Sequence, residues 1–151
     1  MKRAFIFFLT AFFSMQIFAQ SAEDSVKQAV NAMFTAMRNG DGPGLQNSFS
    51  STAVLQTIKK DKEGTISVAT EDIKEFVDFV SKQKKGAADE RITFETIKID
   101  GPLAIVWTPY KFYFESKFSH CGVNSFQLIR LKEGWKIQYI IDTRRKDGCQ
   151  E

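Results

Sequence analysis

The sequence has very little of the chemistry that metal sites require. Its 151 residues include one histidine, His120, and two cysteines, Cys121 and Cys149. A protein metal site normally holds its ion with three or four histidine, cysteine or carboxylate ligands, and a single histidine has no such partners. We therefore predict no metal and no cofactor. We expect His120 to be a surface residue beside the cysteine, with no catalytic role.

A strong excess of charge is also absent. The chain has 21 basic and 18 acidic residues, for a formal net charge of +3, which falls to +1 if Lys2 and Arg3 are removed with a leader peptide. Proteins that bind nucleic acid usually carry a large basic footprint. We therefore do not expect nucleic acid as a partner. There is also no internal repeat, low-complexity region or linker.

The N-terminus has the layout of a secretory signal peptide. Lys2 and Arg3 precede an apolar run over residues 4–18, and the small residue Ala19 offers a cleavage point. The run is shorter than the roughly 20 residues of a membrane span, although an uncleaved anchor is the alternative. No cysteine follows that could carry a lipid. We predict a cleaved signal peptide over 1–19 and a single domain over 20–151. The mature protein is then periplasmic or secreted, without a membrane partner.

The two cysteines bracket a predicted β-hairpin. Glu133 and Gly134 are the predicted two-residue turn, and this choice fixes the strand register. The predicted partners are Lys132 with Trp135, Arg130 with Ile137, Leu128 with Tyr139 and Phe126 with Ile141, with Cys121 near Lys146. Cys121 and Cys149 then lie at the same open end of the hairpin. In an oxidising compartment a disulfide is favoured, and its loop of about 28 residues would contribute on the order of 3 kcal/mol.

Apolar periodicity predicts the remaining elements. We predict helices over 21–38 and from about 72 to 84, a single helical turn over 45–49, strands over 53–59, 65–69, 91–100 and 103–115, and a connection over 116–120. Because the helices are largely separated from the long strands, we predict an α+β domain. A strongly twisted antiparallel sheet would wrap the N-terminal helices and leave a cone with an apolar pocket.

Several short motifs support this arrangement and carry a family resemblance. They are the Gly40-Asp41 break, Cys121-Gly122-Val123-Asn124, Gly134-Trp135-Lys136-Ile137, and Asp142-Thr143-Arg144-Arg145 followed by Cys149. The mature chain resembles the nuclear transport factor 2-like superfamily, and within it the exported proteins filed as “putative lumazine-binding”. The resemblance implies a cone-shaped α+β roll of the cystatin-like kind, which often dimerises through its sheet. We therefore expect a homodimer through the sheet.

The predicted pocket residues are aromatic or neutral. They are Trp107, Tyr110, Phe112, Asn124, Phe126 and Tyr139. Tyrosine and asparagine supply the few directed hydrogen bonds that are typical of small-molecule sites. The alternative is that these residues form an ordinary core and a dimer face, because aromatic side chains are common in both.

Acidic residues give no clear catalytic group. Enzymes of the superfamily resemble one another in placing acids or bases inside the cone, where burial tunes the pKa for proton transfer. Here Asp142 is at a strand end, and Glu95 and Glu115 would face inward only if the register differs by one residue. We predict no catalytic residue. Arg144 either binds an anion or, in the simpler interpretation, pairs with Asp142 and fixes the position of the C-terminal tail.

These observations favour an exported, non-catalytic domain that binds a small apolar or aromatic ligand, or a partner protein, through its cone and sheet. The alternative is a cofactor-free dehydratase, isomerase or cyclase that acts on a small carbonyl compound. In that case Tyr139, Asn124 and Tyr110 would polarise the carbonyl oxygen. A purely structural dimer is a third possibility.

Overall fold

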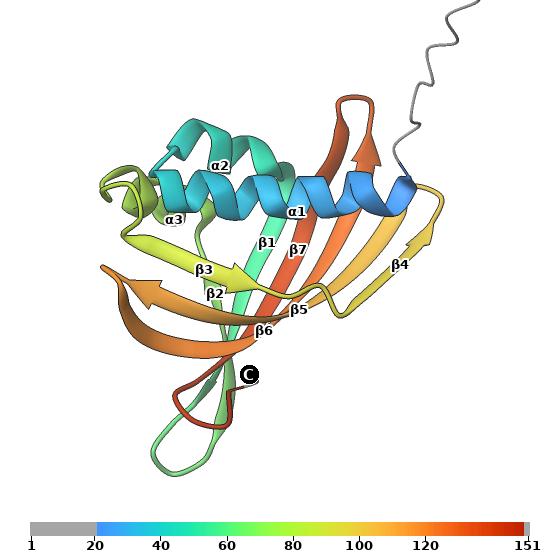
Figure 1. The fold of residues 1–151 in the computed structure, drawn as a ribbon. Coiled ribbons are helices and arrows are strands. Elements are labelled where there is room, and N and C mark those ends of the chain that lie inside the picture. The colour runs from blue at the N-terminus through green and yellow to red at the C-terminus, as the bar shows by residue number, and fades with distance from the viewer. Residues whose placement is uncertain (1–20, 150–151) are drawn as a thin grey trace, which may run out of the picture.

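A computed structural model describes residues 21–149, so the predicted signal peptide lies outside the described residues (Figure 1). The helices are α1 (Ala22–Asn39), α2 (Gly42–Ser48) and α3 (Ile73–Ser81). The strands are β1 (Phe49–Lys60), β2 (Ile66–Glu71), β3 (Ala88–Ile92), β4 (Thr96–Asp100), β5 (Leu103–Phe114), β6 (Lys117–Leu131) and β7 (Gly134–Arg145). Across this part of the chain, no helix is both long enough and apolar enough to cross a membrane.

The first helix follows from its capping residues and its apolar stripe. The Ser21 hydroxyl accepts a hydrogen bond from the Asp24 backbone N–H at 3.0 Å, and the helix ends at Gly40 with a φ of 68°. That left-handed conformation favours glycine. The buried residues recur at helical spacing and face the sheet: Val26, Val30, Met33, Phe34, Ala36 and Met37. The predicted helix is therefore confirmed.

The other two helices begin at aspartate caps. Asp41 accepts from the Gly44 N–H at 2.9 Å, so α2 starts before the predicted single turn. Asp72 accepts from the Glu75 N–H at 3.0 Å and starts α3. The prediction for α3 ran too far, because the chain after Ser81 turns toward α1. There the Gly86 N–H donates to the Arg38 carbonyl oxygen at 2.7 Å.

The strands form one curved, unclosed sheet that wraps α1 (Figure 1). Its order is β2-β1-β7-β6-β5-β3, and β4 pairs separately with β5. The α+β class is confirmed. The sheet is mixed, because β1 pairs in parallel with β7 while the other neighbours are antiparallel. The first strand thus joins the sheet beside the last.

The predicted strand over 91–100 is in fact two strands. Both β3 and β4 pair with β5, and the register between them shifts by one residue opposite Pro109. Proline has no N–H to donate to a ladder, so regular pairing is interrupted there. At the break, the Thr93 N–H still donates to the Pro109 carbonyl oxygen at 3.0 Å.

The predicted connection over 116–120 was also wrong. A tight turn at Glu115 and Ser116, whose φ values are 48° and 65°, leads directly into β6 at Lys117. Two consecutive positive φ values are typical of the turn that matches the twist of a hairpin. Residues 117–120 therefore belong to the sheet.

The final hairpin has a different register from the predicted one. Leu131 pairs with Gly134, so the turn residues are Lys132 and Glu133. All the predicted pairs were therefore wrong. The observed pairs are Arg130 with Trp135, Leu128 with Ile137, Gln127 with Tyr139, Phe126 with Ile140 and Cys121 with Arg145. Leu128 pairs with Ile137, but its neighbour Gln127 pairs with Tyr139. Gln138 therefore has no partner in β6, and this extra residue forms a β-bulge in β7.

The bulge decides which side chains of β7 face α1. Before it, Ile137 faces the helix and is fully buried. After it, Ile140 and Asp142 are the buried residues, whereas Tyr139 bonds to Gln56. The Gln138 side chain is held at the bulge, where its Oε1 accepts from Ser50 at 2.6 Å and its Nε2 donates to the Thr52 carbonyl oxygen at 3.0 Å.

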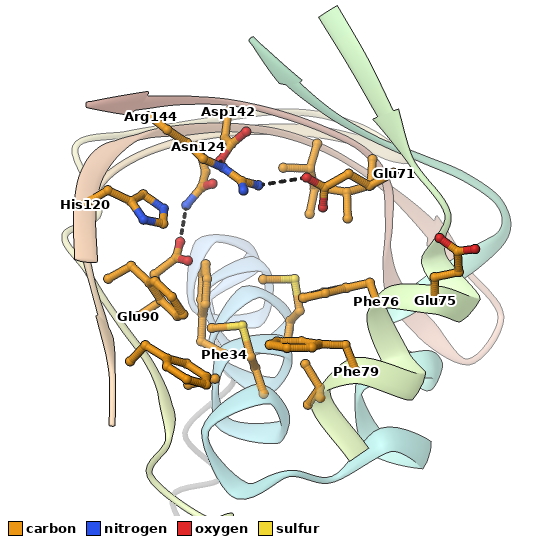
Figure 2. Close-up of a pocket in the computed structure, with 18 of the residues that line it drawn as sticks. Phe34, Glu71, Glu75, Phe76, Phe79, Glu90, His120, Asn124, Asp142 and Arg144 are labelled. Atoms are coloured by element: carbon orange, nitrogen blue, oxygen red, sulfur yellow. Dashed lines mark hydrogen bonds and ion pairs between the residues drawn. The ribbon is translucent and has the colours of Figure 1, made fainter. Parts of the chain in front are cut away.

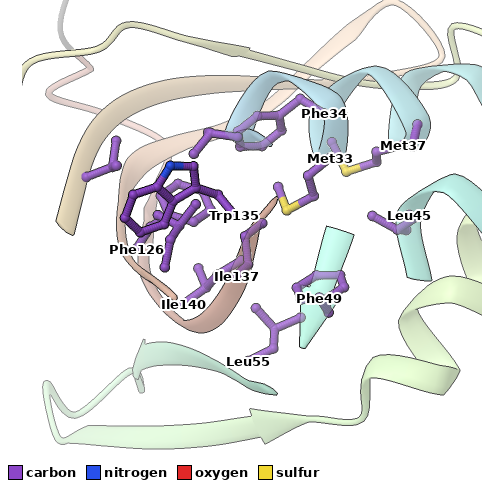
Figure 3. Packing of buried hydrophobic residues seen from close by; sticks show 14 of the residues in the cluster. Met33, Phe34, Met37, Leu45, Phe49, Leu55, Phe126, Trp135, Ile137 and Ile140 are labelled. Atoms are coloured by element: carbon purple, nitrogen blue, oxygen red, sulfur yellow. The ribbon is translucent and has the colours of Figure 1, made fainter. Parts of the chain in front are cut away.

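The hydrophobic core lies between α1 and the concave face of the sheet (Figure 3). Phe126 is fully buried and meets Phe34 edge to face, with ring centroids 6.0 Å apart. Trp135 packs in the same cluster, and its indole N–H donates to the Ser25 hydroxyl at 3.1 Å. The N-terminal half of α1 thus packs directly against the buried side chains of the sheet.

The predicted disulfide is present. Cys121 and Cys149 are bonded with their Cα atoms 5.8 Å apart. The register error did not affect this prediction, because Cys121 pairs with Arg145, only one residue from the predicted Lys146. The bond connects the end of the chain to β6.

We expect Cys149→Ser to lower the free energy of unfolding by about 3 kcal/mol, because the unfolded chain would lose a closed loop of 28 residues. Urea unfolding of the variant and of the oxidised wild type measures this difference. Wild-type protein kept under reductant is the control and should match the variant. Two reactive thiols in the unfolded, oxidised wild type would contradict the prediction.

Candidate functional site

A cavity of about 520 Å³ lies between the C-terminal half of α1, helix α3 and the concave face of the sheet (Figure 2). One side is apolar and is lined by Met33, Phe34, Met37, Phe76, Phe79 and Val80. The opposite side is polar and is lined by Glu71, Glu90, His120, Asn124, Asp142 and Arg144. The helices therefore supply one apolar wall. The strands supply the polar wall and further apolar residues: Leu55, Ala88, Phe112, Phe114 and Ile140.

Strand alternation brings the polar residues together. His120 and Asn124 are four residues apart on β6, and Asp142 and Arg144 are two apart on β7, so each pair faces one side of the sheet. Gly122 lies between the β6 residues. A Cβ at this position would be 1.7 Å from the Thr143 carbonyl oxygen, so only glycine fits.

Arg144 is held by three side chains. Its Nε donates to Asp142 at 2.8 Å, and its Nη2 donates to Thr57 at 2.8 Å and to Glu71 at 3.1 Å. Burial acts to lower the pKa of Arg144, but the hydrogen bond and charge of Asp142, with the charge of Glu71, raise it overall. Arg144 thus connects β7 to the β1–β2 hairpin and stays protonated.

Asp142 is supported from behind by Tyr110. The Tyr110 hydroxyl lies 3.2 Å from Asp142 Oδ2 and 3.0 Å from the Thr143 carbonyl oxygen, and it donates to them. Burial, followed by the charge of Asp142, raises the pKa of Tyr110, so it remains a neutral donor. The other carboxylate oxygen of Asp142, Oδ1, is buried and has no hydrogen-bond partner among residues 21–149.

Glu90 is the carboxylate most suited to proton transfer. Asn124 Nδ2 donates to Glu90 Oε1 at 2.7 Å. Burial raises the pKa of Glu90 to about 7, and Asp142 also raises it, whereas Asn124 and Arg144 oppose the change. The side chain keeps some accessible surface because it faces the cavity. Near neutral pH, Glu90 can therefore either hold or accept a proton.

His120 is not the surface residue that the sequence predicted. It lies half-buried in β6, with its ring centroid 5.2 Å from Phe112 and 5.7 Å from Tyr110. Burial, followed by the charge of Arg144, lowers the pKa of His120 and favours the neutral ring at pH 7. Its Nδ1 lies 3.0 Å from the Ser119 hydroxyl.

Only two of the six predicted pocket residues line the cavity. Phe112 and Asn124 line the cavity. Phe126 is in the core, and Tyr110 is buried behind Asp142. Trp107 is 46% exposed, because it alternates along β5 with the buried Val106 and Thr108. Tyr139 lies beyond the bulge and bonds to Gln56 at 2.7 Å, so it is not among the lining residues.

Sequence reasoning missed Glu90 because the predicted strand began at residue 91, three residues after the start of β3. The segment Ala88–Ile92 places Ala88, Glu90 and Ile92 at alternate positions, so all three face one side of β3. A strand extended back to Ala88 would have placed Glu90 between two inward apolar residues. Neither Glu95 nor Glu115 lines the cavity. In residues 21–149, no group of three or more histidine, cysteine or acidic residues could hold a metal ion.

Comparison with known families agrees with this architecture. The sequence profile of the family described as “Putative lumazine-binding” matches residues 21–139. The chain belongs to this family. No protein among those with curated descriptions matches the sequence.

Solved structures related to this member of the “Putative lumazine-binding” family have the nuclear transport factor 2-like fold. A protein of unknown function from Shewanella baltica is 14% identical, covers 83% of this chain and 94% of its own, and has a TM-score of 0.62. A cystatin-like domain of unknown function from Nostoc punctiforme is 20% identical, with 82% and 76% covered and a TM-score of 0.60. A protein from Streptomyces avermitilis, described as a “putative dehydratase”, is 14% identical, with 81% and 94% covered and a TM-score of 0.58. At these identities the similarity shows the fold alone.

The raised pKa of Glu90 predicts a measurable effect on stability. Between its ordinary pKa near 4.5 and about 7, the folded state holds a proton that the unfolded state has released. The free energy of unfolding therefore falls as pH rises through this window. We expect Glu90→Gln to remove this loss. The variant should be more stable than the wild type at pH 8, by on the order of 3 kcal/mol, and nearly equal at pH 4.

Urea unfolding at several pH values measures this difference. Glu95→Gln is the matched control, because Glu95 is an exposed glutamate that does not line the cavity. It should follow the wild type at every pH. If Glu90→Gln also follows the wild type, Glu90 does not have a raised pKa.

Proposed function

We propose that this protein binds a small organic molecule in the cavity between α1, α3 and the sheet. The observation that carries this proposal is the division of a cavity of about 520 Å³ into an apolar wall and a polar wall. Small-molecule sites typically have volumes of roughly 300–1,000 Å³, an apolar lining and a few polar groups that orient the ligand. The family description adds support for a flat heteroaromatic ligand.

We also propose that the protein is exported, with residues 1–19 removed. The Cys121–Cys149 disulfide supports this proposal, because such bonds persist in oxidising compartments. The intact mass of the protein from its own host should correspond to residues 20–151 with the disulfide formed. A mass that includes residues 1–19 would contradict cleavage.

The homodimer expected from the family resemblance stays a prediction. Leu103, Ile105 and Trp107 are each more than 40% exposed and lie at alternate positions on β5, away from the core. Such a row of exposed apolar residues is suited to packing against the same face of a second copy of the protein. Sedimentation velocity at several protein concentrations measures the oligomeric state. A monomer at every concentration would contradict the predicted homodimer.

Proton transfer is the second candidate function, and the position of Glu90 favours it. A carboxylate with a pKa of about 7 can act as a general base at neutral pH, and Asn124 beside it can donate a hydrogen bond. The tyrosines proposed from the sequence do not serve this reaction. Tyr139 does not line the cavity, and the Tyr110 hydroxyl is engaged by Asp142 and Thr143.

For this second function, we expect the protein to accelerate exchange of the acidic α-protons of 2-tetralone, a bicyclic ketone, with deuterium from solvent. Glu90→Gln should reduce the exchange rate by at least about 100-fold, because the base is lost. Proton NMR follows the exchange, and Glu95→Gln is again the control. Equal rates with and without the wild-type protein would exclude this activity toward the ketone and leave the binding proposal untouched.

For ligand binding, we expect Phe79→Ala to weaken the affinity for lumazine about tenfold, because one aromatic face of the cavity is lost. Phe79 is 48% exposed and its ring lies 6.4 Å from that of Phe114, so its replacement should leave the fold intact. The fluorescence anisotropy of lumazine measures the affinity.

Phe118→Ala is the matched control for this experiment. Phe118 is 45% exposed and has a similar ring contact, 5.9 Å from Tyr113, but does not line the cavity. It should bind lumazine like the wild type. The cavity proposal fails if lumazine and other bicyclic aromatic compounds, basic amines included, do not bind and no small molecule accompanies the protein from its host in native mass spectrometry.

A further inference from the structure

The charges that line the cavity are strongly unbalanced. Five acidic residues line it, namely Glu71, Asp72, Glu75, Glu90 and Asp142, whereas Arg144 is the single arginine or lysine in its lining. Charges at the edge of a low-dielectric cavity act on a ligand more strongly than charges in water do. The lining therefore favours positive charge in the ligand.

The arginine does not offset this imbalance for a ligand. Its Nε and Nη2 already donate to Asp142, Thr57 and Glu71 at 2.8–3.1 Å. Only Nη1 has no hydrogen-bond partner in residues 21–149, so an anionic ligand would have to bind that nitrogen beside the two carboxylates that hold the rest of the guanidinium. It would also bring a third negative charge close to them.

One carboxylate oxygen that faces the cavity, by contrast, has no donor. Asn124 donates to Glu90 Oε1, and no described residue donates to Glu90 Oε2. The unpartnered Oδ1 of Asp142 is itself buried, so a molecule in the cavity does not reach it. Glu90 Oε2 is therefore the acceptor that a ligand N–H group would meet.

The apolar wall completes the recognition. Figure 2 shows Glu90 and Asn124 on one side of the cavity, and Phe76 and Phe79 on the other. A ligand that lies between them would meet the Glu90 carboxylate at one end and the rings of Phe76 and Phe79 at the other. Aromatic faces attract cations as well as apolar groups.

We propose that the ligand is an organic cation, with a protonated amine or amidine nitrogen on Glu90 and an apolar body against Phe76 and Phe79. This inference rests on the proposed function and names the chemical class of its ligand. Ligands whose polar end is a carboxylate or phosphate are disfavoured by the same charges. Glu90 is the residue that determines this specificity.

The binding of such a cation depends on pH. The groups around Glu90 are Asn124 and His120 on β6, Tyr110 on β5, Asp142 and Arg144 on β7, and Glu71 at the end of β2. The lining residues of α1 are Met33, Phe34 and Met37, which carry no charge, whereas α3 and its cap add Glu75 and Asp72. The pKa of Glu90, about 7, means that the carboxyl is mostly protonated at pH 6 and mostly ionised at pH 8. A strongly basic amine stays protonated at both values, so its affinity should rise with pH.

Three probes with the same bicyclic body test the proposal: 1-naphthylmethylamine, the neutral 1-naphthylmethanol and the anionic 1-naphthoate. Isothermal titration calorimetry at pH 8 should show the amine binding at least ten times more tightly than the alcohol, and the naphthoate most weakly. For the wild type, the affinity for the amine should fall several-fold at pH 6, while that for the alcohol should not change. This pH comparison needs no variant.

Glu90→Gln should reduce the affinity for the amine at least tenfold and leave that for the alcohol unchanged, and Glu95→Gln should change neither. If the alcohol binds as tightly as the amine, or the naphthoate binds more tightly, the cation inference is overturned while the binding site stands. If none of the three binds at millimolar concentration but lumazine or a host molecule does, the cation inference fails alone. If none of these molecules binds, the binding proposal fails and the inference fails with it.

Discussion

The arrangement of the cavity depends on one extra residue in β7. Gln138 is inserted between Ile137 and Tyr139 opposite consecutive residues of β6, so every later side chain of β7 changes face. A one-residue shift has this effect because side chains alternate with a period of two. Without the bulge, Tyr139 and Ile141 would face the helices. With it, Asp142 is buried on that side and lines the cavity together with Arg144.

The bulge also separates the two ends of the concave face. On the side of the bulge nearer the β6–β7 turn, Leu128 and Ile137 are fully buried in the core, together with the N-terminal half of α1. On the other side, the same helix presents Met33 and Met37 to the cavity. One amphipathic helix therefore stabilises the domain by burying apolar surface at one end and supplies a binding wall at the other. The disulfide closes the far end of the same hairpin, so the segment that carries Asp142 and Arg144 is covalently connected to β6.

Much of the fold could be predicted from the sequence because local signals specify it. Helix α1 has a serine cap, an apolar stripe and a terminal glycine, and the disulfide tolerates a register error of one residue. The site could not be predicted in the same way. A glutamine at position 138 does not by itself indicate a bulge. The bulge is stabilised by hydrogen bonds to Ser50 and to the backbone of Thr52, which are distant in sequence. An error of one residue in register leaves the predicted strand correct but exchanges the residues on the two faces of the sheet. For this reason Tyr139 was predicted to line the pocket, whereas Asp142 lines it.

The energetics of the polar wall indicate why it is informative about function. Asp142 is only 8% exposed, and its attraction to the partly exposed Arg144 repays its lost hydration only in part. Glu90 adds a carboxylate whose ionised form is disfavoured by burial. Apolar side chains of similar volume would often give a domain of equal or greater stability. The buried Glu90 carboxylate is therefore poorly explained by folding alone, and the proposed ligand, by donating a hydrogen bond to it, would account for its presence.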